Sequence, residues 1–401
     1  GAQKLGWTAE TTGQNFKNTK LKSAGWSSFG DYNNKQGTAR TFLTDAAKSR
    51  NCHFVCDCEV ERVLYDTTNT ATGVIARIYD EKKKYRLVTL KAKRAVVVSA
   101  GSLHSPCILL RSKLQNSSIG KHLHLHPVSG VIGNFSSDKE IIKLYEGAPM
   151  TSVCKVNTMI NNGYGALMEV PSAHPGLMGA SVPWNGGYDA IQNLLSINSL
   201  AAILVLQRDH GSGTIQLSST KNWWQRILQV LVRILQTTTT SNDDDADMKP
   251  TIHYKIHKQD AKSMVTTIID ISKLLLAAGA TSIFTLHAGN YQVNTTATED
   301  KDEDLLSKDY IQKNNRIGIQ KEHGVGLFSA HQMGSCRMGT SPSNSVVGCD
   351  GESWEVNNLY VCDASVLPTA TGVNPMITTL SVAQLIATKL KLRLQDEDNN
   401  S

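Results

Sequence analysis

The stretch that decides the fold reads Ser329-Ala330-His331-Gln332-Met333-Gly334-Ser335-Cys336-Arg337-Met338-Gly339 and, after a polar loop, Asn358-Leu359-Tyr360-Val361-Cys362-Asp363-Ala364-Ser365. In its second part polar and apolar residues first alternate, and an apolar run then leads to Asp363. This pattern is typical of a buried strand whose end lies beside a ligand. A third part follows, in which Asn374 takes the N-cap position and Pro375 the first position of a helix that continues to about Leu390. Such a helix start offers free N–H groups and a positive dipole end to an anion.

This series resembles the C-terminal signature of the glucose-methanol-choline (GMC) flavin oxidoreductases, and within that family the long-chain fatty alcohol oxidases. In the family, a histidine of the first part and an Asn or His of the last part face the flavin ring. The residues that match them are His331 and Asn374, and the spacing between them also fits. The resemblance continues more weakly through most of the chain.

The resemblance implies an α/β FAD-binding domain, partial and Rossmann-like, with an α+β antiparallel-sheet substrate domain. We expect the first part of the FAD-binding domain at residues 1–120, the substrate domain at 121–328, and the C-terminal part of the FAD-binding domain, with the catalytic residues, at 329–395. No Gly-x-Gly-x-x-Gly stands between a strand and a helix in the 401 residues. We therefore expect that fingerprint in a segment preceding Gly1.

Two further segments resemble segments that contact the cofactor in this family. The apolar run Ala95–Val98 leads into Ser99-Ala100-Gly101 and a helix, a geometry that brings backbone close to a cofactor. By the same resemblance, the backbone at Val60 lies against the adenine end of FAD, although a core valine is an equal alternative. The remaining flavin-binding residues implied are Gly101, Asp363 on the ribityl chain, Ala364, Asn374, Pro375 and Met376.

Two cysteine and histidine patterns invite a metal interpretation, which we do not adopt. Cys56 and Cys58 have no second ligand pair of matching spacing. His122, His124 and His126 alternate as on one face of a strand, but no nearby carboxylate would orient them. Structural roles are therefore favoured over metal binding.

Composition excludes several other functions. With 40% hydrophobic and 19% charged residues the chain is an ordinary globular protein, and its net charge of +6 is spread without the basic run of a nucleic-acid surface. The eight cysteines lie mostly in apolar segments and no secretory signal is present, so an intracellular location is expected. No apolar run reaches the roughly 18 residues of a transmembrane helix.

An unusual segment, Trp223–Leu235, resembles an insertion between two strands of the substrate domain. An apolar helix with two Arg and a Trp pair suits contact with a membrane surface. The alternative is packing on its own domain, because Arg226 and Arg233 share a face with apolar residues.

The expected reaction is oxidation of a long-chain primary alcohol to its aldehyde, with O2 as acceptor and H2O2 as product. A neutral histidine suits the proton step, so His331 is the predicted base, and the Asn374 amide is predicted to hold the alcohol oxygen. FAD would take the hydride, because side chains cannot. The alternatives are another GMC alcohol dehydrogenase or sterol oxidase, or a truncated non-catalytic product.

Overall fold

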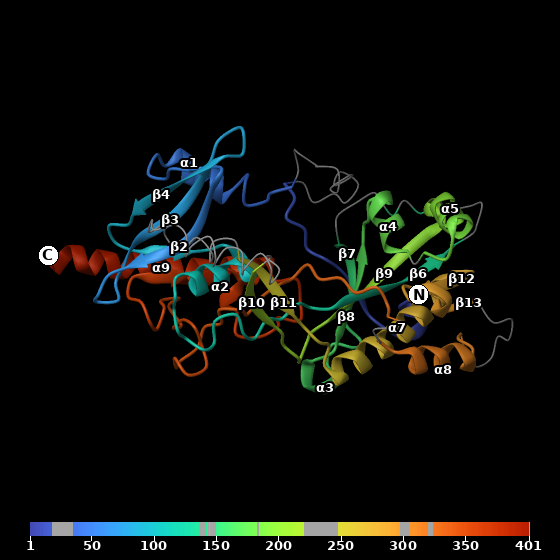
Figure 1. The fold of residues 1–401 in the computed structure, drawn as a ribbon. Coiled ribbons are helices and arrows are strands. Elements are labelled where there is room, and N and C mark those ends of the chain that lie inside the picture. Colours follow the sequence, from blue (N-terminus) through green and yellow to red (C-terminus); the bar gives the residue numbers. More distant parts are fainter. Residues whose placement is uncertain are drawn as a thin grey trace, which may run out of the picture. The chain divides into compact units, whose positions relative to one another are not determined.

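The computed structural model of the chain divides it into two compact, interleaved units (Figure 1). Unit 1 consists of residues 1–54, 126–210 and 256–329, and unit 2 of residues 55–125, 211–255 and 330–401. The structure describes residues 1–17, 35–135, 142, 144, 150–182, 184–219, 248–296, 305–319 and 324–400. The predicted helix at Trp223–Leu235 lies outside the described residues.

Unit 1 is built on a seven-stranded antiparallel sheet in the order β1-β7-β8-β9-β6-β12-β13. Its strands are β1 (Ala9–Thr11), β6 (Val128–Asn134), β7 (Met150–Cys154), β8 (Ala166–Pro171), β9 (Leu200–Gln207), β12 (Ser282–Thr285) and β13 (Asn294–Thr296). Strands β6 and β9 are apolar and almost wholly buried, as expected for the centre of a sheet. The antiparallel α+β arrangement predicted from sequence is confirmed.

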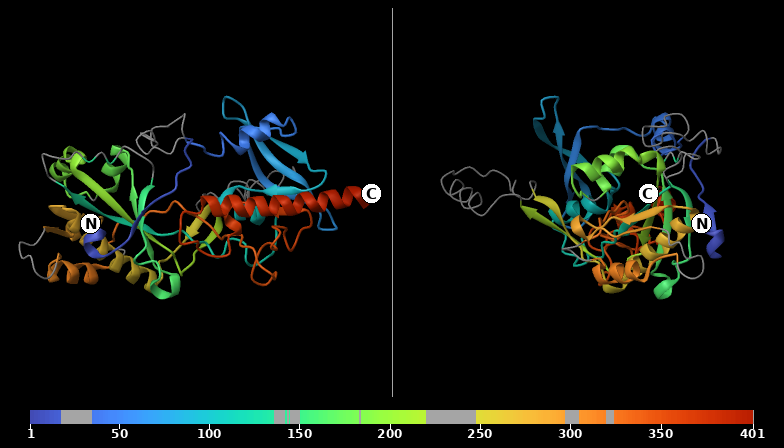
Figure 2. Two further views of the ribbon diagram at one scale, coloured as in Figure 1. Left: turned by 180° about the vertical axis from the view of Figure 1, so that it is seen from behind. Right: turned by 90° about the vertical axis from the view of Figure 1, so that its right-hand side faces the viewer.

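One long helix, α7 (Lys258–Ala278), packs on this sheet against β6, β8, β9 and β12 (Figures 1 and 2). Its buried face carries Met264, Ile268, Ile271 and Leu275 at the helical period, and these side chains form the centre of the larger core. The helix ends at Gly279, whose φ of 109° lies in the left-handed region that favours glycine.

The described part of unit 1 also contains shorter helices. They are η1 (Gln3–Leu5), α1 (Phe42–Lys48), α3 (Ile160–Gly163), α4 (Pro175–Ser181), α5 (Gly187–Leu195), η4 (Ile197–Ser199), η5 (Gly289–Tyr291) and α8 (Lys308–Ile317). The helix α8 joins α7 through a 2.7 Å hydrogen bond between the hydroxyls of Ser272 and Tyr310. Burial raises the pKa of Tyr310 to about 12, so this hydroxyl remains protonated at any working pH.

The residues described in unit 2 form three small sheets. The antiparallel sheet β2 (Cys58–Tyr65), β3 (Ala71–Tyr79), β4 (Tyr85–Lys91) is a meander, β10 (Thr214–Ser219) pairs with β11 (Met248–His253), and β5 (Val96–Val98) runs parallel to β14 (Leu359–Val361). The helices in the described part of the unit are α2 (Gly101–Arg111), η6 (Ala364–Val366) and α9 (Met376–Asn400). A second hydrophobic core joins β5, β14 and α2 to Ile386 of α9.

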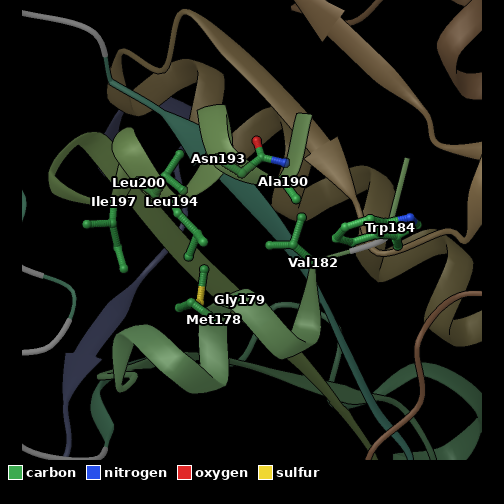
Figure 3. A pocket seen from close by; sticks show the side chains of 9 residues that line it. All are labelled: Met178, Gly179, Val182, Trp184, Ala190, Asn193, Leu194, Ile197 and Leu200. Carbon is green, nitrogen blue, oxygen red and sulfur yellow. The ribbon is translucent and has the colours of Figure 1, made fainter. Parts of the chain in front are cut away.

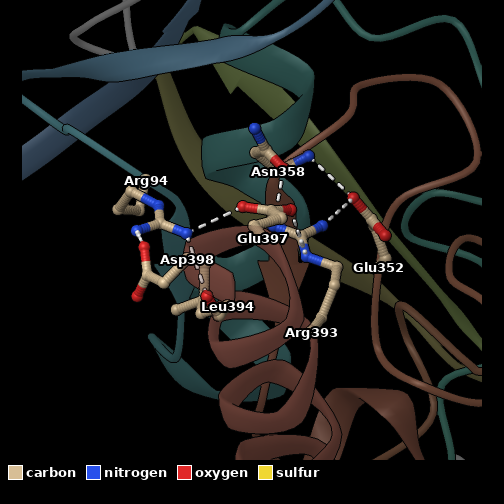
Figure 4. Close-up of polar contacts among 7 residues, drawn as sticks. All are labelled: Arg94, Glu352, Asn358, Arg393, Leu394, Glu397 and Asp398. Carbon is tan, nitrogen blue, oxygen red and sulfur yellow. Dashed lines mark hydrogen bonds and ion pairs between the residues drawn. The ribbon is translucent and has the colours of Figure 1, made fainter. Parts of the chain in front are cut away.

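The last helix differs from its predicted limits. It begins at Met376 rather than Pro375 and continues to Asn400, well past Leu390. Ion pairs hold its final turns: Arg94 pairs with Glu397 and Asp398, and Arg393 pairs with Glu352 and Glu397 (Figure 4). Ion pairs can stabilise the end of a helix that has no apolar face there. For this reason the spacing of apolar residues, which stops at about Leu390, predicted a helix that is too short.

The compact units also divide the chain differently from the ranges predicted. Residues 1–54 belong to unit 1, because β1 pairs with β7, and residues 211–255 belong to unit 2. The roles assigned to residues 1–120, 121–328 and 329–395 stay a prediction. Among the described residues no helix is long and apolar enough to cross a membrane.

Candidate active site

The predicted cofactor edge is formed by two parallel strands of unit 2. Val96 pairs with Leu359 and Val98 with Val361, so β5 and β14 run in register and end side by side. The chain leaves β5 toward Gly101 and leaves β14 toward Asp363. Ligands of open α/β sheets bind outside the carboxyl ends of such strands, and both predicted residues lie there.

The carboxylate of Asp363 ties these strand ends together. One oxygen accepts hydrogen bonds from the Gly101 N–H, at 2.9 Å, and from the Ser105 hydroxyl. The other accepts from the Ser365 N–H at 2.7 Å and caps η6. A carboxylate accepts about four hydrogen bonds, so Asp363 has capacity left for a ligand after these three.

Gly101 leaves open space at the start of α2. Its φ is 78°, and a Cβ placed on it would meet no atom within 4 Å. The backbone at this position is therefore open to a large ligand, at the N-terminal end of an eleven-residue helix. These features fit a cofactor that approaches the backbone closely.

The segment that carries His331 is held on several sides within unit 2. The Ser102 hydroxyl donates to the Gln332 carbonyl at 2.8 Å, and the Ser335 hydroxyl donates to the Ser102 carbonyl at 2.6 Å. Met333 exchanges backbone hydrogen bonds of 2.9 and 3.0 Å with His124. The residues that follow His331 are thus positioned by α2 and by the strand-like segment at His124.

These hydrogen bonds around Met333 and Ser335 form a frame for the segment, and Gly334 lies where its backbone segments pack most closely. Its N–H donates to the Ala364 carbonyl at 3.2 Å, and its φ is 87°. A Cβ at Gly334 would lie 2.4 Å from the backbone oxygen of His122, a distance that no side chain tolerates. Only glycine fits where three backbone segments meet.

We expect Gly334→Ala to lower the free energy of unfolding by about 2 to 5 kcal/mol, because left-handed strain adds to a backbone clash. Gly101→Ala is the matched control, with a similar φ but open space, and should lose only about 1 to 2 kcal/mol. Urea denaturation of both variants measures the difference. Equal losses would contradict the close packing at Gly334.

His331 itself is partly buried, and burial lowers its pKa below the ordinary value of 6.5. The imidazole is therefore neutral at neutral pH. A neutral imidazole accepts a proton, which is the state that the predicted base requires.

Asn374 lies in the same unit, in the loop before α9. The first helical hydrogen bond is accepted by the Pro375 carbonyl, 2.8 Å from the Thr379 nitrogen, so Pro375 rather than Asn374 is the residue at the helix boundary. The predicted N-cap position of Asn374 is wrong by one residue. Its side chain is exposed, and its pairing with His331 across one alcohol oxygen stays a prediction.

The other predicted residues take clear places in unit 2. Val60 pairs with Ala76 beside a β-bulge and packs partly buried against the core. Ala364 begins η6, and its carbonyl accepts from Gly334 and Leu367. Met376 is exposed at the first position of α9.

The three alternating histidines do not lie along one face of a strand. His122 and His126 have φ values of 60° and 47°, which break a regular strand, and His126 belongs to unit 1. The described part of the chain contains no group of three or more His, Cys, Asp or Glu side chains arranged to hold a metal ion.

The sequence interpretation missed Ser102, Ser105 and Gly334 as positioning residues. Gly334 stands inside the quoted Met-Gly-Ser, and Ser102 and Ser105 stand shortly after the quoted Ser99-Ala100-Gly101. Their spacing alone did not reveal which carbonyl or carboxylate each one contacts.

Known proteins resemble this chain over most of its length. Two family models, both described as GMC oxidoreductase, match residues 1–128 and 236–383. Long-chain-alcohol oxidase FAO4A of Arabidopsis thaliana is 33% identical over 88% of this chain and 44% of its own length. Long-chain-alcohol oxidase FAO1 of the same plant is 28% identical over 97% of this chain and 48% of its own length. The chain thus spans about half the length of these relatives.

Solved structures show the same fold. A pyridoxine 4-oxidase from Mesorbium loti matches with a TM-score of 0.60 at 15% identity, covering 89% of this chain and 62% of that one. A formate oxidase from Aspergillus oryzae matches with a TM-score of 0.60 at 14% identity, covering 90% of this chain and 64% of that one. At these identities the likeness concerns the fold alone.

Proposed function

Because the chain belongs to the GMC oxidoreductase family, we propose that it forms the catalytic part of an FAD-dependent oxidase of long-chain primary alcohols. The alcohol becomes an aldehyde, and O2 becomes H2O2. The observation that carries this proposal is the frame that holds a neutral His331 beside the cofactor edge. The names of the relatives support the choice of alcohol.

FAD is the cofactor of an enzyme of this family, and the residues at the strand edge fit it. Open backbone at Gly101 allows close approach, and Asp363 has a remaining acceptor site for a hydroxyl group. We propose that Val60, Ala364, Pro375 and Met376 complete the contact surface. When bound, FAD supplies the hydride acceptor that no side chain provides.

The side chains perform the proton and orientation steps. The neutral imidazole of His331 takes the hydroxyl proton of the alcohol while the carbon faces the hydride acceptor. The amide of Asn374 donates a hydrogen bond to the same oxygen and stabilises the alkoxide character that develops there. Both groups come from loops, and the frame around Gly334 keeps one of them in place.

Substrate preference tests the proposal directly. Full-length protein loaded with FAD is mixed without oxygen with dodecanol, choline, glucose or cholesterol, and flavin bleaching is followed. Fast reduction by dodecanol alone supports a long-chain-alcohol oxidase. Faster reduction by one of the others would assign a different GMC activity, and reduction by none would favour a non-catalytic product.

Asn374 variants separate a chemical role from a structural one. Because Asn374 is exposed and does not cap α9, Asn374→Ala and Asn374→Ser should both stay within about 0.5 kcal/mol of wild-type stability. Loss of a hydrogen bond to the developing alkoxide should lower kcat about a hundredfold in both. Melting curves and steady-state kinetics measure the two effects. Wild-type kcat in either variant would remove Asn374 from the site.

The place of action is also a proposal. We propose an intracellular enzyme whose apolar substrate is concentrated at membranes, so that contact with a membrane surface would help it reach the alcohol.

A further inference from the structure

Away from the candidate active site, the described part of the chain offers a pocket and a pair of accessible thiols. The pocket, about 160 Å³ in volume, lies between α4 and α5 (Figure 3). Its described lining includes no acid, base or thiol, and Asn193 is its most polar side chain. The thiols belong to Cys56 and Cys58 of unit 2, and a thiol pair can be oxidised reversibly. The thiol pair is therefore the feature that can carry further chemistry.

Both cysteines lie at the start of the meander sheet of unit 2. Cys56 is exposed, and Cys58 is partly buried as the first residue of β2. Both are free thiols in this structure. Oxidants select thiols according to their exposure, so this pair is open to a small oxidant.

The backbone between the two cysteines turns at Asp57. The chain bends at Cys56 and Asp57, and the φ of Asp57 is 50°. A residue other than glycine with this φ is confined to the left-handed helical region. Helical dihedrals of either hand place the Cα atoms of the two flanking residues roughly 5.5 Å apart, against roughly 6.6 Å in a strand. Most disulfides join Cα atoms about 5.5 to 6 Å apart, so the turn gives Cys56 and Cys58 the separation that a disulfide needs.

Backbone hydrogen bonds hold this turn in place. The Asp57 carbonyl accepts from the Tyr79 N–H at 2.9 Å, and Cys58 pairs with Ile78 of β3. The two thiols therefore lie on one short, anchored segment. Groups held near one another react with each other faster than with a second molecule, so closure within the chain is favoured over cross-linking of two chains.

The oxidant that fits this pair is hydrogen peroxide, which the proposed reaction releases. One thiol, as its thiolate, attacks a peroxide oxygen, the O–O bond breaks, and a sulfenic acid and water form. The second thiol attacks the sulfenic sulfur, the S–S bond forms, and the sulfenic oxygen leaves as water. In sum, the two thiols lose two electrons and two protons, and the peroxide becomes two molecules of water.

We propose that Cys56 and Cys58 form a redox site at which hydrogen peroxide closes an intramolecular disulfide across the turn at Asp57. The proposal rests on the proposed function only for the source of the peroxide. Cys58 and Val60 stand two residues apart on β2, so the enzyme's own product modifies the strand for which a cofactor contact is proposed.

Peptide masses after peroxide treatment test the site, using full-length protein that has been reduced, freed of reductant and kept without alcohol. In the Cys52→Ser background, trypsin cleaves after Arg50 and Arg62 and gives a peptide whose only cysteines are Cys56 and Cys58. Peroxide should lower the mass of that peptide by two hydrogen atoms, and a thiol reductant should restore it. A gain of oxygen atoms without a disulfide, or a disulfide between two chains, would overturn the proposal.

Further variants in the same background test the geometry. Cys349→Ser removes another exposed thiol of unit 2 and should leave the rate of closure unchanged. Asp57→Gly should also keep that rate, because glycine adopts the left-handed region freely, whereas Asp57→Val should lower it at least about fivefold, because a β-branched residue resists that region. Equal rates in the two Asp57 variants, or a slower rate in Cys349→Ser, would overturn the proposal.

Peroxide added from outside separates this proposal from the proposed function. A protein that closes the disulfide but oxidises no alcohol would keep the redox site and contradict the proposed function. A protein that oxidises alcohol while Cys56 and Cys58 stay reduced in excess peroxide would overturn the redox site alone.

Discussion

His331→Ala will slow the reduction of bound flavin by alcohol at least about a hundredfold, the usual size of a lost general base. The variant should still bind flavin, because it leaves in place the hydrogen bonds that the backbone of Gln332 and Gly334 makes to the Ser102 hydroxyl and the Ala364 carbonyl. Stopped-flow absorbance measures the rate, and the flavin spectrum measures occupancy. His53→Ala, an exposed histidine outside the site, is the control and should react as wild type does.

The pH dependence of the wild-type rate belongs to the same test. Burial lowers the pKa of His331, so the imidazole stays neutral down to a pH below 6.5, and the rate should fall only on the acid side of that value. The free energy of unfolding should depend on pH in the same direction as the rate. As pH falls below 6.5 the unfolded chain binds the proton first, so stability that is present above 6.5 is lost in acid. A wild-type rate in His331→Ala, or the same acid limb in both proteins, would exclude His331 as the base.

Asp363→Ala will affect stability and flavin binding together. It leaves the N–H groups of Gly101 and Ser365 and the hydroxyl of Ser105 without their charged acceptor. Three hydrogen bonds to a charged group are lost, each worth about 1.5 to 3 kcal/mol, so we expect the free energy of unfolding to fall by at least about 4 kcal/mol and flavin affinity to fall with it.

Asp363→Asn provides the graded comparison, because the amide keeps one acceptor oxygen for the Gly101 and Ser105 donors. It should lose roughly half as much stability as Asp363→Ala. Urea denaturation and flavin titration measure the two variants. Unchanged stability in Asp363→Ala would show that these contacts do not hold the strand ends together.

Long periodic segments of this protein were predictable from sequence because their signals are local. The apolar spacing of α7 and its glycine stop are contained in one stretch, and so are the apolar runs of β9 and β5. The family motif also identified His331, Gly101 and Asp363 as candidates, since their order and spacing are properties of the chain itself.

The tertiary structure decided what depends on distant partners. Ala9 pairs with Cys154, so the first strand joins the sheet of unit 1, and no local pattern specifies such a pairing. Arg94 extends α9 through Glu397 and Asp398, whereas the apolar spacing of that helix ends earlier.

The candidate site shows the same division between local and distant causes. The motif names His331, but the frame that positions it comes from Ser102 and from the meeting of Gly334 with the His122 backbone. Sequence alone determined which residue types are available for the chemistry. Only the packed structure determined which carbonyl, carboxylate or N–H each one meets, because hydrogen bonds form between atoms that folding brings together from far apart in the chain.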